Sequence, residues 1–170
     1  MSAVVLVEGA SDRVALETLA RRRGRDLAAE GVAVVAIGGA QAIGRALERF
    51  GGTGVGVAGM CDAGEEALFR RALGANVFVC VEDLEDELIR ALGAERVEEV
   101  LEAEGDLRPF RTMQKQPEWR GRPVHDQLRR FLGSGARRKI RYARFLVEAL
   151  DLDRVPRPLA AVIEHTFVAY

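Results

Sequence analysis

The sequence predicts an α/β fold with a central parallel sheet of about four strands, helices on both faces and a helical C-terminal extension. Short apolar runs recur in the first half of the chain, at residues 3–7, 32–37, 55–60 and 77–81. A segment with helical spacing follows each run, which is typical of repeated β-α units. The runs are apolar throughout rather than alternating, as expected for strands that helices cover on both faces.

The helices expected within this first part span residues 11–24, 41–50, 64–73 and 83–92. The first of them places Leu16 and Leu19 on one side and directs Arg21 and Arg22 to solvent. The glycine-rich stretch at residues 37–44 lacks the Gly-Lys-Ser/Thr of a P-loop and does not fit GxGxxG. It therefore predicts a tight turn and not a nucleotide site.

After about residue 93 the strand pattern stops, and only helical segments are expected. These span residues 94–104, 124–132, 136–150 and 158–167. Residues 105–123 contain Pro109, Pro117 and Pro123, and predict an irregular loop that acts as a hinge. The resulting division has a core at residues 1–93 and a helical extension at residues 94–170, which carries a basic helix.

The length and composition of the chain limit the kinds of protein it can be. A chain of 170 residues with 48% hydrophobic content suits one domain with a modest extension. The formal net charge of -1 gives no overall attraction to nucleic acid or anionic membranes. The charge is unevenly distributed, since residues 82–106 hold eleven acids and two arginines, whereas residues 120–144 hold nine basic residues and one acid. Any binding of anions must therefore come from local patches.

Other features indicate a cytoplasmic protein that does not bind membranes. No stretch approaches the roughly 20 apolar residues of a membrane span, and the N-terminus does not resemble a signal peptide. Cys61 and Cys80 end apolar runs without metal-ligand spacing, so we expect buried thiols and no disulfide. His125 and His165 have no partner at ligand spacing, which favours solvent or core roles.

Carboxylates follow three of the predicted strands. Glu8 follows the first, Asp62 the third, and Asp83 and Glu85 the fourth. A single acid after a strand, or Asp12 at the start of a helix, needs no functional explanation. The carboxyl ends of parallel strands, however, meet at one edge of the sheet, so we expect these acids to lie close together. Crowded carboxylates favour a divalent cation, and an all-oxygen set suits Mg²⁺ or Mn²⁺. Two such ions about 3.5–4 Å apart could promote phosphoryl transfer.

These residues resemble the TOPRIM domain, and more narrowly that of the overcoming-lysogenization-defect (OLD) nucleases. TOPRIM domains are Rossmann-like, with a glutamate after the first strand and a DxD pair after the third. Glu8 resembles that glutamate, Asp62 the first aspartate of the pair, and Asp12 the additional acid of OLD-type domains. Asp83 and Glu85 resemble the acidic pair through which OLD-type domains bind a second metal.

The resemblance also implies a basic residue in the helical region, which Lys139 matches. One position departs from the pattern, because Gly64 occupies the second place of the DxD pair. Glu65 is adjacent and has a longer reach, so it is the predicted substitute ligand. The implied catalytic residues are Glu8, Asp62 and Lys139, and the implied metal ligands are Glu8, Asp12, Asp62, Glu65, Asp83 and Glu85.

The resemblance implies a nuclease that hydrolyses phosphodiester bonds with Mg²⁺ or Mn²⁺, with DNA as the favoured substrate. OLD nucleases carry an ATPase domain before the TOPRIM region, whereas this chain starts at the first strand. We therefore expect a stand-alone form in which any regulation by ATP comes from a separate ATPase partner. A homodimer is left open. Basic residues of the segment 129–144 could contact phosphates, or could instead pair with the acidic stretch 82–106.

Two other functions remain open at this point. The altered DxD pair could have removed catalysis and left a metal-dependent adaptor that binds nucleic acid or protein. The enzyme could instead act on nucleotides or small phosphoesters. Trp119, which lies beside Arg120 and Arg122, could stack on a base or fill an apolar edge.

Overall fold

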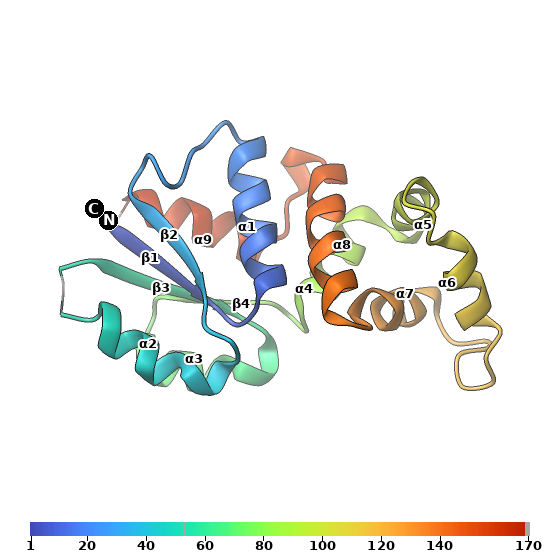
Figure 1. Cartoon of the computed structure of the whole chain (residues 1–170), viewed down its shortest axis with the longest axis horizontal. Coiled ribbons are helices and arrows are strands. Elements are labelled where there is room, and N and C mark those ends of the chain that lie inside the picture. Colours follow the sequence, from blue (N-terminus) through green and yellow to red (C-terminus); the bar gives the residue numbers. More distant parts are fainter. Residues whose placement is uncertain (53, 169–170) are drawn as a thin grey trace.

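A computed structural model describes residues 1–52 and 54–168 of the chain (Figure 1). Its centre is a single parallel sheet with the strand order β2-β1-β3-β4. The strands are β1 (Ala3–Val7), β2 (Val32–Ala36), β3 (Gly56–Cys61) and β4 (Val77–Val79). The predicted α/β class and the parallel sheet are confirmed.

The central strand β1 sets the register of the sheet. All five of its residues are buried. Its last residue, Val7, pairs with Ala36 of β2 on one side and with Met60 of β3 on the other. Glu8 and Asp62 therefore leave the sheet at neighbouring points of the same edge.

Helices cover both faces of the sheet (Figure 1). One face packs against α1 (Ala10–Arg22) and α9 (Arg157–Val168), and the other against α2 (Ile43–Phe50) and α3 (Glu66–Leu73). Successive residues of β1 point to opposite faces, so Val5 joins the core beneath α1 while Leu6 joins the core with Phe69 of α3. Cys61 and Cys80 are buried free thiols, as predicted.

The remaining helices extend the core away from the sheet. They are α4 (Leu84–Leu92), α5 (Ala94–Ala103), α6 (Leu107–Gln114), α7 (Val124–Gly133) and α8 (Ala136–Ala149), with short 3-10 turns η1 (Ala40–Ala42), η2 (Ala63–Glu65) and η3 (Leu152–Arg154). Helix α8 lies beside α1, whereas α5, α6 and α7 stand farther from the sheet (Figure 1). None of the described helices is long and apolar enough to cross a membrane.

The predicted solvent position of Arg22 is wrong. Its Nη1 atom donates hydrogen bonds to the carbonyl oxygens of Val147 and Leu150 at 2.9 and 2.7 Å. These carbonyls lie at the end of α8, where most backbone oxygens lack a helical partner, although that of Val147 also accepts from the N–H of Leu150 at 3.3 Å. Arg22 therefore fastens α8 to α1, and a pattern within one helix could not reveal a partner about 125 residues away.

The predicted loop at residues 105–123 is partly wrong, because it contains α6. Pro109 is the third residue of this helix, where its missing N–H would have no helical partner in any case. Phe110 is fully buried and makes an edge contact with Phe131 of α7, with ring centroids 5.4 Å apart. Tertiary packing thus selects a helix where proline content suggested a break.

The two predicted parts of the chain share a core. One cluster of buried residues joins Val5 and Met60 of the sheet to Leu128 of α7 and Leu146 of α8. The last helix, α9, returns to the sheet and packs on it. A boundary at residue 93 stays a prediction, and the helices that follow it are packed against the first part.

Gly59 of β3 allows α3 to approach the sheet closely. A Cβ atom at this position would lie 2.7 Å from Leu73 Cδ1 and 2.8 Å from Phe69 Cδ1. Both distances are far below van der Waals contact, so a side chain here would push α3 away from β3.

We predict that Gly59→Ala lowers the free energy of unfolding by about 1–3 kcal/mol, because it overpacks this contact. Urea denaturation measures the change. The control is Gly44→Ala in α2, where a Cβ atom has nothing within 4 Å and alanine favours the helix. Equal stability of the Gly59→Ala variant and the unmodified protein would contradict the proposed close approach.

Candidate functional site

The backbone around Glu8 is held by the glycine-rich turn that follows β2. The N–H groups of Gly38 and Gly39 both donate to the carbonyl oxygen of Glu8 at 3.1 Å, and Ile37 donates to Val7 at 2.9 Å. Gly38 and Gly39 have φ angles of 77° and 114°, which disfavour residues with a side chain. The predicted tight turn thus fixes Glu8. Its carboxylate has no hydrogen bond or ion pair to another described residue.

Asp12 lies in the first turn of α1, directly after β1. Its Oδ2 atom accepts a hydrogen bond from the N–H of Gly9 at 2.9 Å. An acid is favourable at this end of a helix, where backbone N–H groups lack partners. The contact holds the Asp12 carboxylate close to the turn that carries Glu8.

Asp62 is held by the segment that follows β4. The N–H of Cys80 donates to the carbonyl of Cys61 at 2.9 Å, and the N–H of Ala63 donates to the carbonyl of Glu82 at 3.1 Å. The segments that carry Asp62 and the later acids are therefore joined. The Asp62 carboxylate, like that of Glu8, has no hydrogen bond or ion pair within the described part of the chain.

Asp83 and Glu85 are already partnered by side chains of the helical part. Asp83 caps α4 by accepting from the N–H of Asp86 at 2.8 Å, and it accepts from Nη2 of Arg129 at 2.7 Å. The Nζ atom of Lys139 lies 3.4 Å from Glu85 Oε1. The helices α7 and α8 thus bring positive charge to the edge of the sheet.

The electrostatics show that the acids lie close together. The pKa of Asp62 is raised to about 7, mainly by burial and then by the charges of four other acids, which are Asp12, Asp83, Glu8 and Glu85 in decreasing order of effect. Burial also raises the pKa of Asp12 to about 6 against the effect of its hydrogen bond from Gly9, with Glu85 and Glu8 adding to the rise and Lys139 opposing it. Carboxylates from distant parts of the sequence therefore share one environment, as the parallel sheet predicted.

Lys139 brings a positive charge close to these carboxylates. Burial tends to lower its pKa, but the carboxylates of Glu85, Asp12 and Asp62 outweigh burial and raise the pKa above its usual value. Burial raises the pKa of Glu85, although Lys139 opposes that rise. Lys139 therefore stays protonated and offsets part of the negative charge.

Comparison with known proteins bears on this arrangement. Residues 1–63, which include Glu8, Asp12 and Asp62, match the family model described as the overcoming lysogenization defect protein-like TOPRIM domain. This part of the chain is therefore similar to an OLD-like TOPRIM domain. No curated protein matches the sequence.

Two solved structures resemble nearly the whole chain. The C-terminal region of the Burkholderia pseudomallei OLD protein has a TM-score of 0.70 and 17% identity, and the match covers 98% of this chain and 97% of that one. The C-terminal region of the Xanthomonas campestris pv. campestris OLD protein has a TM-score of 0.69 and 20% identity, covering 96% and 91%. The chain, its helical extension included, therefore has the fold of these C-terminal regions.

TOPRIM domains generally bind divalent metal ions, and the carboxylates of this chain have suitable chemistry. Glu8, Asp12, Asp62 and Glu85 offer oxygen ligands, which hard cations such as Mg²⁺ prefer. Among the described residues, however, no three Asp, Glu, His or Cys side chains are gathered closely enough to enclose an ion. The donors and the electrostatics thus fit a metal, and coordination would require the side chains to approach one another.

The structure does not bring Glu65 into this group. Glu65 ends the turn η2 and is not among the main charges that raise the pKa of Asp62. Gly64 is exposed, and a Cβ atom there would have nothing within 4 Å. The proposed replacement of the missing aspartate by Glu65 remains a prediction, whereas space for an aspartate at position 64 is present.

The sequence did not reveal the contacts of Asp86 and Glu87. Asp86 pairs with Arg90 at 2.8 Å and with Nε2 of His125 at 2.8 Å, and Glu87 accepts from the N–H of Val81 at 2.8 Å. The prediction that His125 lacks a partner at ligand spacing missed Asp86, which lies 39 residues earlier. The sequence shows the dense run of acids at residues 82–87, but their spacing does not indicate which of them face solvent.

The basic segment of the helical part is divided between two roles. Arg129 pairs with Asp83, Lys139 with Glu85, and Arg141 with Asp106 at 3.9 Å, as expected if the segment pairs with the acidic stretch. Arg130 and Arg137 make no hydrogen bond or ion pair with other described residues. Part of the segment thus remains available to anions.

We predict that the metal-free protein loses stability as the pH rises through about 7. Because the pKa of Asp62 is raised from 3.8 to about 7 on folding, the folded protein binds more protons than the unfolded chain between these values. Asp62→Asn should therefore be more stabilising at about pH 8 than at about pH 5, by about 1 kcal/mol after solvent screening.

Urea denaturation with a chelator present measures this difference at both pH values. Asp153→Asn is the matched control, since Asp153 is exposed and its side chain has no ion pair with a described residue. A stabilising effect of Asp62→Asn that does not change with pH would contradict the crowding of carboxylates.

Proposed function

We propose that the chain is a nuclease that uses Mg²⁺ or Mn²⁺ to hydrolyse phosphodiester bonds of nucleic acid, with DNA as the first substrate to test. The proposal rests on one observation, the shared environment of Asp62, Asp12, Glu8 and Glu85 beside Lys139. Holding several carboxylates close together lowers the stability of the fold unless a cation offsets their negative charge. The OLD-like TOPRIM match supports a module that binds metal and acts on nucleic acid.

Under this proposal Glu8 and Asp62 hold the metal ion, with Asp12 or Glu85 completing the protein ligands. Glu8 and Asp62 are favoured because their carboxylates have no other partner in the described structure. The ion would act as a Lewis acid on the phosphate and lower the pKa of water near the scissile bond. One water is consumed, the P–O bond breaks, and the products are a phosphate monoester and a hydroxyl group.

Lys139 has a separate role in the proposal. Its ammonium group lies among the acids and stays charged, so it can stabilise the negative charge that develops on the phosphoryl oxygens. Asp83 has a structural role and does not contact the substrate, because its oxygens already accept hydrogen bonds from Arg129 and from the first turn of α4. Its predicted part in a second metal site requires release from Arg129.

A hollow beside Asp83 supports nucleic acid as the substrate. It has a volume of about 340 Å³. Its lining consists of Asp83, Trp119, Arg122, Asp126, Arg129, Arg130 and Gly133, so three arginines face two acids there. The guanidinium of Arg122 lies 5.2 Å from the centre of the Trp119 ring. Arginines can bind phosphates, and a tryptophan offers a surface on which a base stacks.

A metal-dependent adaptor is the second candidate, and one observation favours it. Asp83 and Glu85 are neutralised by Arg129 and Lys139, and no three potential ligands are gathered within the described residues. Gly64 also removes one expected carboxylate. A domain of this kind could bind one ion and nucleic acid without cleaving it.

The two candidates are separated by cleavage assays on plasmid, single-stranded DNA and RNA with Mg²⁺ or Mn²⁺, alongside calorimetric metal titration. Glu8→Gln and Asp62→Asn should each lower the cleavage rate by about 100-fold or more, because each removes a ligand. Lys139→Met should lower the rate by about 10²–10³-fold and leave metal affinity nearly unchanged.

The matched controls are Glu48→Gln and Lys115→Met, both exposed and remote from the acids, and they should retain the original rate. Gly64→Asp should tighten metal binding relative to Gly64→Ala, since the space around position 64 is open. Metal binding without cleavage that depends on Glu8 and Asp62 would contradict the nuclease and favour the adaptor. Cleavage confined to mononucleotide esters would restrict the substrate to small phosphoesters.

A further inference from the structure

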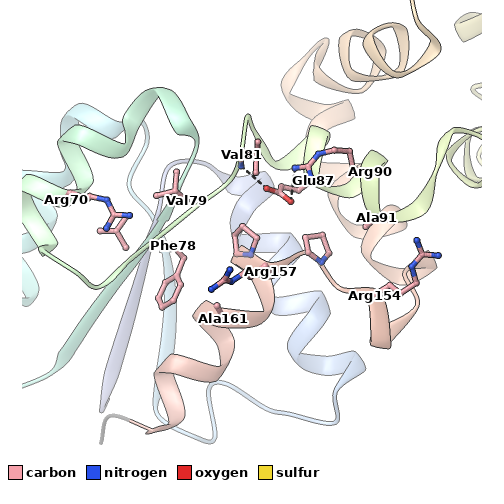
Figure 2. A pocket seen from close by; sticks show the side chains of 13 residues that line it. Arg70, Phe78, Val79, Val81, Glu87, Arg90, Ala91, Arg154, Arg157 and Ala161 are labelled. Carbon is pink, nitrogen blue, oxygen red and sulfur yellow. Dashed lines mark hydrogen bonds and ion pairs between the residues drawn. The ribbon is translucent and has the colours of Figure 1, made fainter.

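A second hollow lies along β4, between residues of α3, α4 and α9 (Figure 2). Its volume is about 660 Å³, which is larger than that of the hollow beside Asp83. None of the predicted catalytic or metal-binding residues lines it. Its role is therefore a separate question from the nuclease proposal.

The lining shows that the hollow follows the edge of the sheet. Three successive residues of β4 border it, namely Val77, Phe78 and Val79. Since neighbouring side chains of a strand point to opposite faces, a hollow that contacts all three must be open at the strand edge. Arg70 from α3 borders it on one face of the sheet and Ala161 from α9 on the other (Figure 2). The hollow is thus a groove between the two helical layers.

The backbone of β4 is unpaired on this side. Asn76 and Cys80 direct their backbone groups to β3, where the carbonyl of Asn76 accepts from Gly59 at 2.9 Å and the N–H of Cys80 donates at 2.9 Å. The intervening Val77 and Val79 therefore point their N–H and C=O groups outward. No described residue bonds to those outward groups. An exposed strand edge of this kind is a template for another strand.

The lining of the groove carries more positive than negative charge. Four arginines line it, Arg70, Arg90, Arg154 and Arg157, and Glu87 is its one acid. Arg70 pairs with Glu66 and Arg90 with Asp86, so Arg154 and Arg157 supply the positive charge that no described acid offsets. Glu87 is occupied by the N–H of Val81 and by Arg90 at 3.1 Å. The exposed side chains of Arg154 and Arg157 make no hydrogen bond or ion pair with other described residues.

Apolar side chains form the rest of the lining. Phe78, Pro156, Pro158 and Ala161 lie among the arginines, and Val81 is 65% exposed beyond the end of β4. A ligand for the groove must therefore combine negative charge, apolar side chains and a backbone that can continue the sheet.

We propose that this groove binds an extended acidic peptide segment of a partner protein, which adds to β4 as a further strand. Main-chain hydrogen bonds to Val77 and Val79 provide the pairing, and Arg154 and Arg157 select acidic side chains. A nucleic acid strand could bind the arginines but lacks the alternating N–H and C=O groups that the strand edge requires. A second copy of this chain would bring the same four arginines together.

The test uses fluorescence anisotropy with a labelled peptide of about ten residues in which valine and glutamate alternate. The protein should bind this peptide, and the double variant Arg154→Glu/Arg157→Glu should weaken binding by about tenfold or more, because it reverses the complementary charge. N-methylation of alternate peptide residues should weaken binding by a similar factor, since it removes main-chain donors on the pairing side.

The matched control is Arg45→Glu/Arg71→Glu, which makes the same charge change at exposed positions outside the groove and should retain the affinity. Circular dichroism checks that all variants fold. Absence of peptide binding, or binding that N-methylation does not affect, would overturn the proposal. So would tighter binding of a labelled oligothymidylate with the same dependence on Arg154 and Arg157, or concentration-dependent dimerisation that the double variant abolishes.

Discussion

The main constraint on this structure is the negative charge that the parallel sheet gathers at one of its edges. Val7 of β1 pairs with Met60 of β3, so Glu8 and Asp62 emerge side by side, and the segment after β4 brings Glu85 to the same place. Burial and mutual repulsion raise the pKa of Asp62 to about 7. Folding thus holds these carboxylates at a cost in free energy, and a bound cation would recover that cost.

The helical part of the chain partly relieves this charge. Lys139 of α8 approaches Glu85, and Arg129 of α7 binds Asp83, which itself begins α4. Apolar packing attaches both helices to the sheet, and Arg22 of α1 binds a backbone carbonyl at the end of α8. The helical extension therefore supplies positive charge to the site as well as part of the core, and the sheet and the extension form one electrostatic unit.

The sequence predicted the sheet because its strands are buried on both faces and lack alternation, and it predicted the meeting of the acids because parallel strands end at one edge. It did not predict α6, since the packing of Phe110 outweighs the local effect of Pro109. It did not predict Arg22 on α8 or His125 on Asp86 either, because those contacts join residues far apart in the chain. Periodicity describes one element at a time, whereas side-chain pairing depends on how elements meet.

We propose that Glu8 and Asp62 are two ligands of one divalent cation, whose binding offsets the crowded charge. Anomalous scattering from a crystal soaked in Mn²⁺ locates the ion. We expect an anomalous peak about 2.0–2.6 Å from carboxylate oxygens of both Glu8 and Asp62. An ordered site with no peak at these acids, under conditions in which Mn²⁺ supports activity or binds in solution, would contradict it.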